Sequence, residues 1–68
     1  MHYGRIINDY YENEMTSYER ECIETYSFKY RLGYLEAWAK LKHEVIMDCF
    51  RLELPESETI AQLRRRLP

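Results

Sequence analysis

The sequence predicts an all-α protein in which two long helices form a hairpin, a short third helix follows at the C-terminus, and two copies pair into a homodimeric bundle. The chain has 68 residues but only two glycines and two prolines, and residues 5–54 contain just one of these four, Gly33. Apolar side chains recur every three or four residues, which is the period of one helix face. Residues 1–68 form a single small domain, because a chain this short buries too little surface for two cores.

The first fifteen residues continue the helical pattern without a clear boundary. Ile7, Tyr11 and Met15 repeat at a spacing of four, which is typical of a helix face. Residues 1–15 are therefore helical or partly flexible. Whether they form a separate helix or an unbroken extension of the next one stays open.

The first long helix is expected over residues 16–32. It begins at "TSYE", where Thr16 and Glu19 have the spacing of a capping box. Gly33 is expected to be its C-cap, because a glycine inside one continuous helix would cost about 1 kcal/mol. The apolar stripe of this helix, with Ile23 at its edge, consists of Tyr18, Cys22, Tyr26 and Tyr30.

The second long helix is expected over residues 34–54, where Glu36 precedes Lys40 at a favourable spacing of four. At about 100° per residue, one stripe of this helix is apolar. It consists of Tyr34, Trp38, Leu41, Val45, Cys49 and Leu52. Four flanking apolar residues widen the arc to about half of the circumference, more than one partner helix covers: Leu35, Ala39, Ile46 and Phe50. The stripe is therefore the candidate protein interface, packed against the first helix and against a second copy of the chain.

The third helix is expected over residues 56–67. Pro55 ends the second helix and suits the first turn of the next one. The apolar positions of this helix are Ile60, Leu63 and Leu67, with Glu56 and Glu58 near its start. Arg64, Arg65 and Arg66 lie where a helix C-terminus favours positive charge, and they are also candidate phosphate contacts.

No arrangement typical of catalysis, of a cofactor or of a metal is present. Cys22 and Cys49 occupy apolar positions and are interpreted as reduced core thiols, a disulfide between them being the alternative. His43 and Cys49 lie on different faces of one helix, so no zinc site is predicted. Two glycines 29 positions apart make no phosphate-binding loop. We expect a protein that is not an enzyme and needs no cofactor.

Charge and hydropathy indicate the cellular compartment of the protein and the classes of partner that it can bind. No signal segment follows Met1 and no apolar run approaches the roughly 20 residues of a membrane span, so a cytoplasmic protein without a membrane partner is expected. A net charge of -2 makes nucleic-acid binding weak or absent. The acidic residues of the first third form either a solvated helix face or a mimic of phosphates: Asp9, Glu12, Glu14, Glu19, Glu21 and Glu24.

The segment "GYLEAWAKLKHEVIMDCFRLELPESETIAQL", residues 33–63, resembles the C-terminal helical tail of the recombination-promoting nuclease (Rpn) family of transposase-like proteins. "MTSYERECIETY", residues 15–26, is similar to the acidic helix before that tail. Family tails carry more Glu-Gly repeats and often finish in Gly-Leu-Ser and a further helix, where this chain has its arginines and Pro68. The family's nuclease core contains a Glu-x-Lys pattern, and this sequence has none.

The resemblance implies a tail without its nuclease, which in that family restrains the full-length enzyme as an antitoxin-like inhibitor. We therefore expect a helical dimer that binds a larger protein, a full-length nuclease relative, in nuclease regulation or phage defence. Two alternatives remain: a small phage or bacterial regulator that contacts DNA phosphates through residues 64–66, and an acidic decoy that inhibits a nucleic-acid-binding enzyme.

Overall fold

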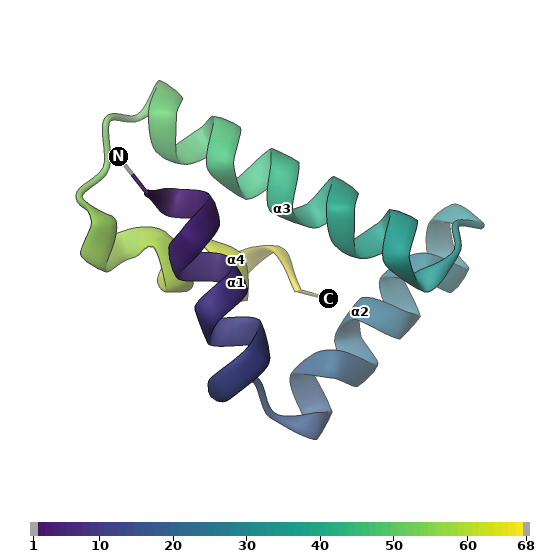
Figure 1. Ribbon diagram of the computed structural model, residues 1–68. Helices are drawn as coiled ribbons and strands as arrows, with labels where there is room; N and C mark the ends of the chain where they lie inside the picture. Colours follow the sequence, from purple (N-terminus) through teal and green to yellow (C-terminus); the bar gives the residue numbers. More distant parts are fainter. Residues whose placement is uncertain (1, 68) are drawn as a thin grey trace.

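The computed structural model describes residues 2–67, and all the regular structure in this range is helical. The elements are α1 (Tyr3–Asn13), α2 (Ser17–Tyr30), α3 (Tyr34–Arg51), the 3-10 turn η1 (Glu56–Glu58) and α4 (Thr59–Arg66). Helix α3 contacts α1, α2 and α4, and it lies along one edge of the molecule with the other helices on one side of it (Figure 1). The all-α prediction is confirmed, with three helices packed around α3 in place of two long helices and a short third one.

Helix α1 is a separate element, which decides the alternative that the sequence left open. It ends at Asn13, after which the amides of Glu14 and Met15 both donate to the Tyr10 carbonyl, at 2.9 and 2.8 Å. Helix α2 then begins with the predicted capping box. The Thr16 hydroxyl accepts from the Glu19 amide at 3.2 Å, and the Glu19 carboxylate accepts from the Thr16 amide at 3.1 Å. Two independent caps therefore separate the helices.

The break between α2 and α3 lies where the sequence predicts it, but the left-handed residue is Arg31 and not Gly33. Arg31 has φ 56° and ψ 45°, whereas Gly33 has φ -66° and is the N-cap of α3. The Leu32 amide donates to the carbonyl of Ser27, five residues earlier, at 2.9 Å, which is the hydrogen bond that defines a Schellman motif. Leu32 packs against the core. The apolar contact that accompanies this motif therefore sets the end of α2, because a helix ending at Gly33 would not place Leu32 there.

Helix α3 ends at Arg51, earlier than the predicted end at Leu54. Glu53 is left-handed, with φ 52°, and the Leu54 amide donates to the Cys49 carbonyl at 3.0 Å. A second Schellman motif therefore ends the helix at Arg51, so Pro55 is not the residue that terminates it. The predicted third helix begins as the 3-10 turn η1 and becomes α-helical only from Thr59.

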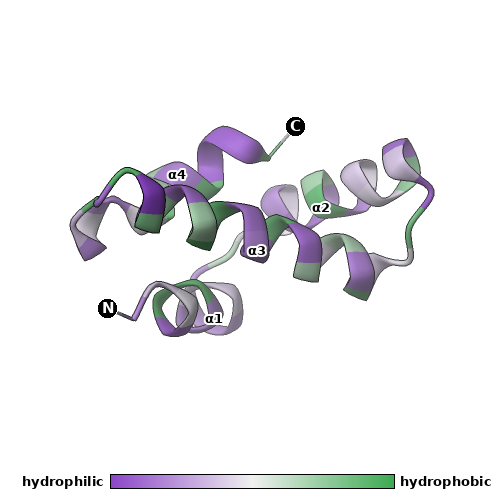
Figure 2. Ribbon diagram, turned by 90° about the horizontal axis from the view of Figure 1, so that it is seen from above, coloured by the Kyte–Doolittle hydropathy of each residue, from purple (hydrophilic) through white to green (hydrophobic). Residues whose placement is uncertain are grey.

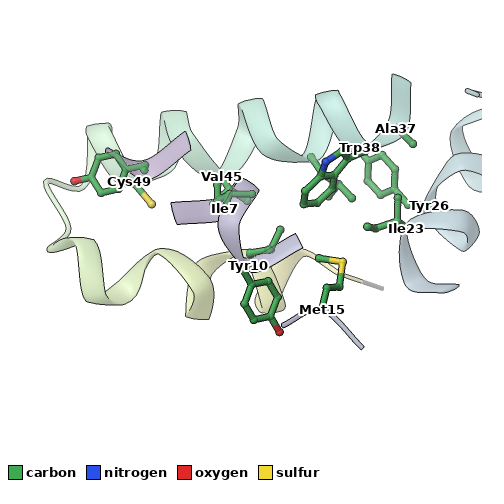
Figure 3. Packing of buried hydrophobic residues seen from close by; sticks show 12 residues of the cluster. Ile7, Tyr10, Met15, Ile23, Tyr26, Ala37, Trp38, Val45 and Cys49 are labelled. Carbon is green, nitrogen blue, oxygen red and sulfur yellow. The ribbon is translucent and has the colours of Figure 1, made fainter. Parts of the chain in front are cut away.

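The core gathers side chains from all four helices (Figure 3). Its buried members are Tyr3, Ile7, Tyr10, Met15, Ile23, Tyr26, Ala37, Trp38, Leu41, Val45, Cys49 and Leu63. The stripe predicted for α2 is wrong at its ends, because Tyr18 and Tyr30 are exposed. The α2 residues that are buried lie in the middle of the helix: Cys22, Ile23, Tyr26 and Ser27. The predicted face of α4 is confirmed by buried Leu63 and by Ile60 and Leu67 packed against the core.

Helix α1 covers part of the wide apolar arc of α3. The Tyr11 ring stacks on Trp38 with centroids 4.7 Å apart, and the Tyr3 ring meets Phe50 edge-on at 4.9 Å. Because residue 11 meets residue 38 while residue 3 meets residue 50, the two helices run antiparallel. Together with α2 and α4, this helix covers most of the predicted stripe within one chain, whereas three of the four flanking residues stay exposed: Leu35, Ala39 and Phe50.

Candidate protein-interaction surfaces

The six residues predicted as a protein interface do not share one surface. Four of them lie in the core of the chain: Trp38, Leu41, Val45 and Cys49. Tyr34 is partly buried, with its hydroxyl 3.1 Å from that of Tyr11, and burial raises its pKa to about 12. Leu52 is exposed in the turn after α3. A partner could reach the four core side chains only if the helices separated, so the structure assigns them to folding.

A different face of α3 is open. Leu35 is 77% exposed, Met47 53% and Phe50 52%, and Ala39 and His43 are exposed between them. We call these five residues the outer face of α3. Figure 2 shows how hydrophobic and hydrophilic segments alternate along this helix. The sequence reasoning placed three of the five beside the stripe and missed Met47, although positions 35, 39, 43 and 47 repeat at a constant spacing of four.

The two ends of the outer face carry opposite charges. Glu36 is exposed next to Leu35, and it makes no ion pair with any of residues 2–67. Its predicted partner Lys40 instead pairs with Glu44, at 3.0 Å. At the other end Arg51 pairs with Asp48 at 3.0 Å, yet its side chain remains 71% exposed. The face therefore carries an exposed carboxylate at its start and an exposed guanidinium at its end.

An open pocket of about 400 Å³ lies between α2 and α4. Its lining residues are Tyr18, Glu19, Cys22, Arg64 and Leu67. The carboxylate oxygens of Glu19 accept from the Tyr10 hydroxyl at 2.7 and 2.6 Å, and Arg64 Nη2 donates to the same hydroxyl at 3.1 Å. The two charged groups of this pocket, Glu19 and Arg64, are thus joined through the Tyr10 hydroxyl.

The pKa values of Glu19 and Tyr10 both shift away from neutral pH. Burial would raise the pKa of Glu19, but hydrogen bonds from Tyr10 and Thr16 outweigh it and lower that pKa below its usual value. Burial, followed by the bond to Glu19, raises the pKa of Tyr10. Neither group is therefore poised to exchange a proton at neutral pH, and the pocket offers shape more than acid-base chemistry.

The three C-terminal arginines have different surroundings. Arg66 donates to Asp48 through Nε, at 3.0 Å, and also binds Glu44, while Arg64 Nε lies 3.6 Å from Glu19. Only Arg65 is exposed without an ion pair to any of residues 2–67. Phosphate binding by all three would have to break three internal ion pairs, one of Arg64 and two of Arg66. DNA contact through these residues stays a prediction, which an electrophoretic shift at low salt tests.

The acidic residues at positions 9–24 remain on the surface, with one exception. Glu19 turns inward, whereas the other five are exposed: Asp9, Glu12, Glu14, Glu21 and Glu24. None of these five pairs with a cation of residues 2–67 within ion-pair distance. Arg20, the nearest in sequence to several of them, lies over the Tyr11 ring at 4.3 Å and donates to the Tyr11 carbonyl at 2.6 Å. This face therefore keeps its negative charge.

The remaining candidate groups lie apart from one another. Cys22 and Cys49 are both free and buried, and burial raises the pKa of the Cys49 thiol. His43 is exposed on a different face of α3 from buried Cys49. Across residues 2–67, no three His, Cys, Asp or Glu side chains gather as metal ligands would. In the same range no helix has the length and apolar character that crossing a bilayer requires.

Comparisons of this chain with models of protein families, with curated proteins and with solved structures find no match. The resemblance to the Rpn tail therefore stays a prediction, carried by the residues quoted for it.

Proposed function

We propose that this chain is a non-enzymatic helical module that acts by binding proteins: it pairs with a second copy and restrains a larger partner, a full-length nuclease with the same helical tail. The observation that carries this proposal is the outer face of α3. Three large apolar side chains, Leu35, Met47 and Phe50, are each more than half exposed along one side of one helix. Removing exposed apolar side chains from water is favourable, so a helix face that carries several of them is typical of binding surfaces.

The restraining role is supported by what the sequence resembles and by what the fold leaves free. A nuclease with the same tail would present the same kind of helix face, and a short chain could occupy that face without contributing chemistry. The core side chains of α3 are unavailable for this contact because they hold the four helices together. The outer face can bind while the monomer stays folded.

The test is a direct binding measurement between the purified chain and a nuclease that carries this tail. Calorimetry should show binding, and nuclease activity should fall as the chain is added. Met47→Glu should weaken binding by roughly tenfold or more, since it places a charge in an apolar contact. Phe28→Glu is the matched control, because Phe28 is an apolar side chain that is 73% exposed, against 53% for Met47, and lies on α2. Binding that both variants weaken equally, or no binding at all, would refute the proposal.

A second function, an acidic decoy, is favoured by one specific observation. Five carboxylates at positions 9–24 are exposed and make no ion pair within residues 2–67, so they present uncompensated negative charge. A nucleic-acid-binding enzyme could take this surface for phosphates. Replacing Glu12, Glu21 and Glu24 by lysine should then abolish inhibition of such an enzyme, whereas Met47→Glu should leave it unchanged. Unaltered inhibition in the lysine variant would exclude the decoy.

A further inference from the structure

We infer that the outer face of α3 binds the same face of a second copy in an antiparallel dimer, with its two-fold axis at His43 and with Glu36 of each copy paired to Arg51 of the other. This inference rests on the self-association in the proposed function and specifies its surface, orientation and register. It replaces the stripe around Trp38, which the structure places in the core.

The spacing of the exposed residues is symmetric about His43. Ala39 and Met47 lie four residues before and after it, and Glu36 and Phe50 lie seven residues before and after it. In a two-fold dimer, residue i of one copy contacts residue j of the other, and j contacts i. The contact positions of this helix have the same spacing before and after His43. Two copies that pack antiparallel therefore bring matching positions together twice, as two-fold symmetry requires. Spacings of three and four are also those of helices that pack at about 20°.

The side chains at paired positions complement one another in size. Ala39 faces Met47 of the second copy, so a small side chain accommodates a long and adaptable one. Leu35, which is 77% exposed in the monomer, lies one residue before the position opposite Phe50 of the second copy, so these two apolar side chains are neighbours across the interface. The most exposed apolar side chains of α3 are therefore covered together.

The charges select the antiparallel orientation. At a rise of about 1.5 Å per residue, Glu36 lies about 10.5 Å before His43 and Arg51 about 12 Å after it. Antiparallel pairing therefore brings each unpaired Glu36 to the exposed Arg51 guanidinium of the other copy. Parallel pairing would instead set Glu36 against Glu36 and Arg51 against Arg51. The helix dipoles also oppose one another only in the antiparallel dimer.

The size of the face sets the expected strength. Residues 35–51 of one helix span about 25 Å, and a contact along one helix falls below the ~800 Å² per partner that is typical of stable complexes. We therefore expect a reversible dimer whose population rises with concentration, and not a permanent one. Reversibility also lets the same face exchange a second copy for another partner.

Sedimentation equilibrium of the full chain over a wide concentration range tests the charge pairs. Glu36→Arg and Arg51→Glu should each raise the dimer Kd by roughly tenfold, because each creates two like-charge contacts. The double variant E36R/R51E should return to within about threefold of the unmodified chain. Phe28→Glu should leave the Kd unchanged, and circular dichroism should show native helicity in every variant.

Crosslinking tests the register. His43→Cys should oxidise readily to a covalent dimer, because the two copies of residue 43 meet at the axis. Glu36→Cys should not crosslink, since its two copies would lie about 21 Å apart, beyond the reach of a disulfide. The unmodified chain, with its buried Cys22 and Cys49, is the background control.

The possible results distinguish self-association itself from the orientation and register inferred for the dimer. A dimer that crosslinks at both positions is parallel, and one unaffected by the charge variants uses another surface. Either result overturns this inference and leaves self-association standing. A monomer at every concentration overturns both. Restraint of the nuclease is measured in its own assay and can hold or fail independently.

Discussion

Glu19 receives contacts from three segments of the chain. The Tyr10 hydroxyl of α1 donates to both of its oxygens, Thr16 at the start of α2 donates through its amide, and Arg64 of α4 lies 3.6 Å away. A sequence pattern identified only the local contact with Thr16. The contacts with Tyr10 and Arg64 join residues 9 and 45 positions away, and no periodic pattern reports them.

Stability should fall in acid because the pKa values of three carboxyls, Glu19, Glu44 and Asp48, are lowered in the folded protein. Such groups contribute stability that is present above their unfolded pKa of about 4 and is lost as the pH falls through their lower folded pKa. The thermal midpoint should therefore change little from neutral pH to about pH 5 and drop below about pH 4.

The Glu19→Gln variant measures how much one carboxyl group contributes to the pH dependence of stability. It should lower the midpoint at neutral pH and make the acid-induced drop shallower, because the amide cannot titrate. Glu21→Gln is the control, since Glu21 is exposed on the same helix. Parallel curves for Glu19→Gln and the unmodified chain would contradict the role assigned to this network.

Two residues hold a backbone conformation that suits glycine. Arg31 and Glu53 have φ of 56° and 52° at the ends of α2 and α3. Left-handed backbone costs a residue with a Cβ roughly 1 kcal/mol, partly offset in glycine by its freer unfolded state. Arg31→Gly and Glu53→Gly should each raise the free energy of unfolding by about 0.5–1 kcal/mol in urea titrations. Glu21→Gly, inside α2, should lower it by a similar amount.

At the scale of elements, the packing of α1 determines how much of the α3 surface is exposed to solvent. Its residues Tyr3, Ile7 and Tyr10 are buried, and its Tyr11 stacks on Trp38. The sequence could not show whether this segment was ordered, because its apolar stripe fits a docked helix and an extension of α2 equally well. The capping box at Thr16 marks the start of α2 but does not say where α1 packs.

Docking of α1 can be followed through Trp38, the only tryptophan of the chain. Ile7→Ala should cost about 2–4 kcal/mol, because Ile7 is fully buried against the other helices. Tryptophan emission should shift to longer wavelength as α1 detaches and exposes the indole. Leu35→Ala, at an exposed position, should change neither unfolding nor emission. Native emission in Ile7→Ala would mean that α1 is dispensable for the core.

At the scale of the whole molecule, core and surface variants of α3 should behave differently. Trp38→Glu and Val45→Glu place a charge in the core that all four helices share, so circular dichroism should show an unfolded chain. Met47→Glu should keep native helicity, because Met47 is half exposed. If Trp38→Glu remains folded, the core described for this molecule is wrong. Loss of partner binding in a Trp38 or Val45 variant would therefore report unfolding, whereas loss in Met47→Glu reports the surface.

The sequence by itself determined the local structure: the all-helical class, the capping box at Thr16, the break near Gly33 and the apolar face of α4. Each depends on residues within a few positions of one another, where helix periodicity and capping chemistry apply directly. The exact helix ends did not follow, because Leu32 and Leu54 pack into the core and so place the left-handed residues at Arg31 and Glu53.

Only the tertiary structure decided which side of α3 faces solvent. A helical wheel shows a wide apolar arc but not which part neighbouring helices cover, since that depends on contacts such as Tyr11 with Trp38 that join distant segments. Packing of α1 and α4 buried the stripe predicted as an interface, left Leu35, Met47 and Phe50 outside, and tied Arg64 and Arg66 to internal carboxylates. Burial is a property of the assembled chain, and a linear pattern of residue types does not contain it.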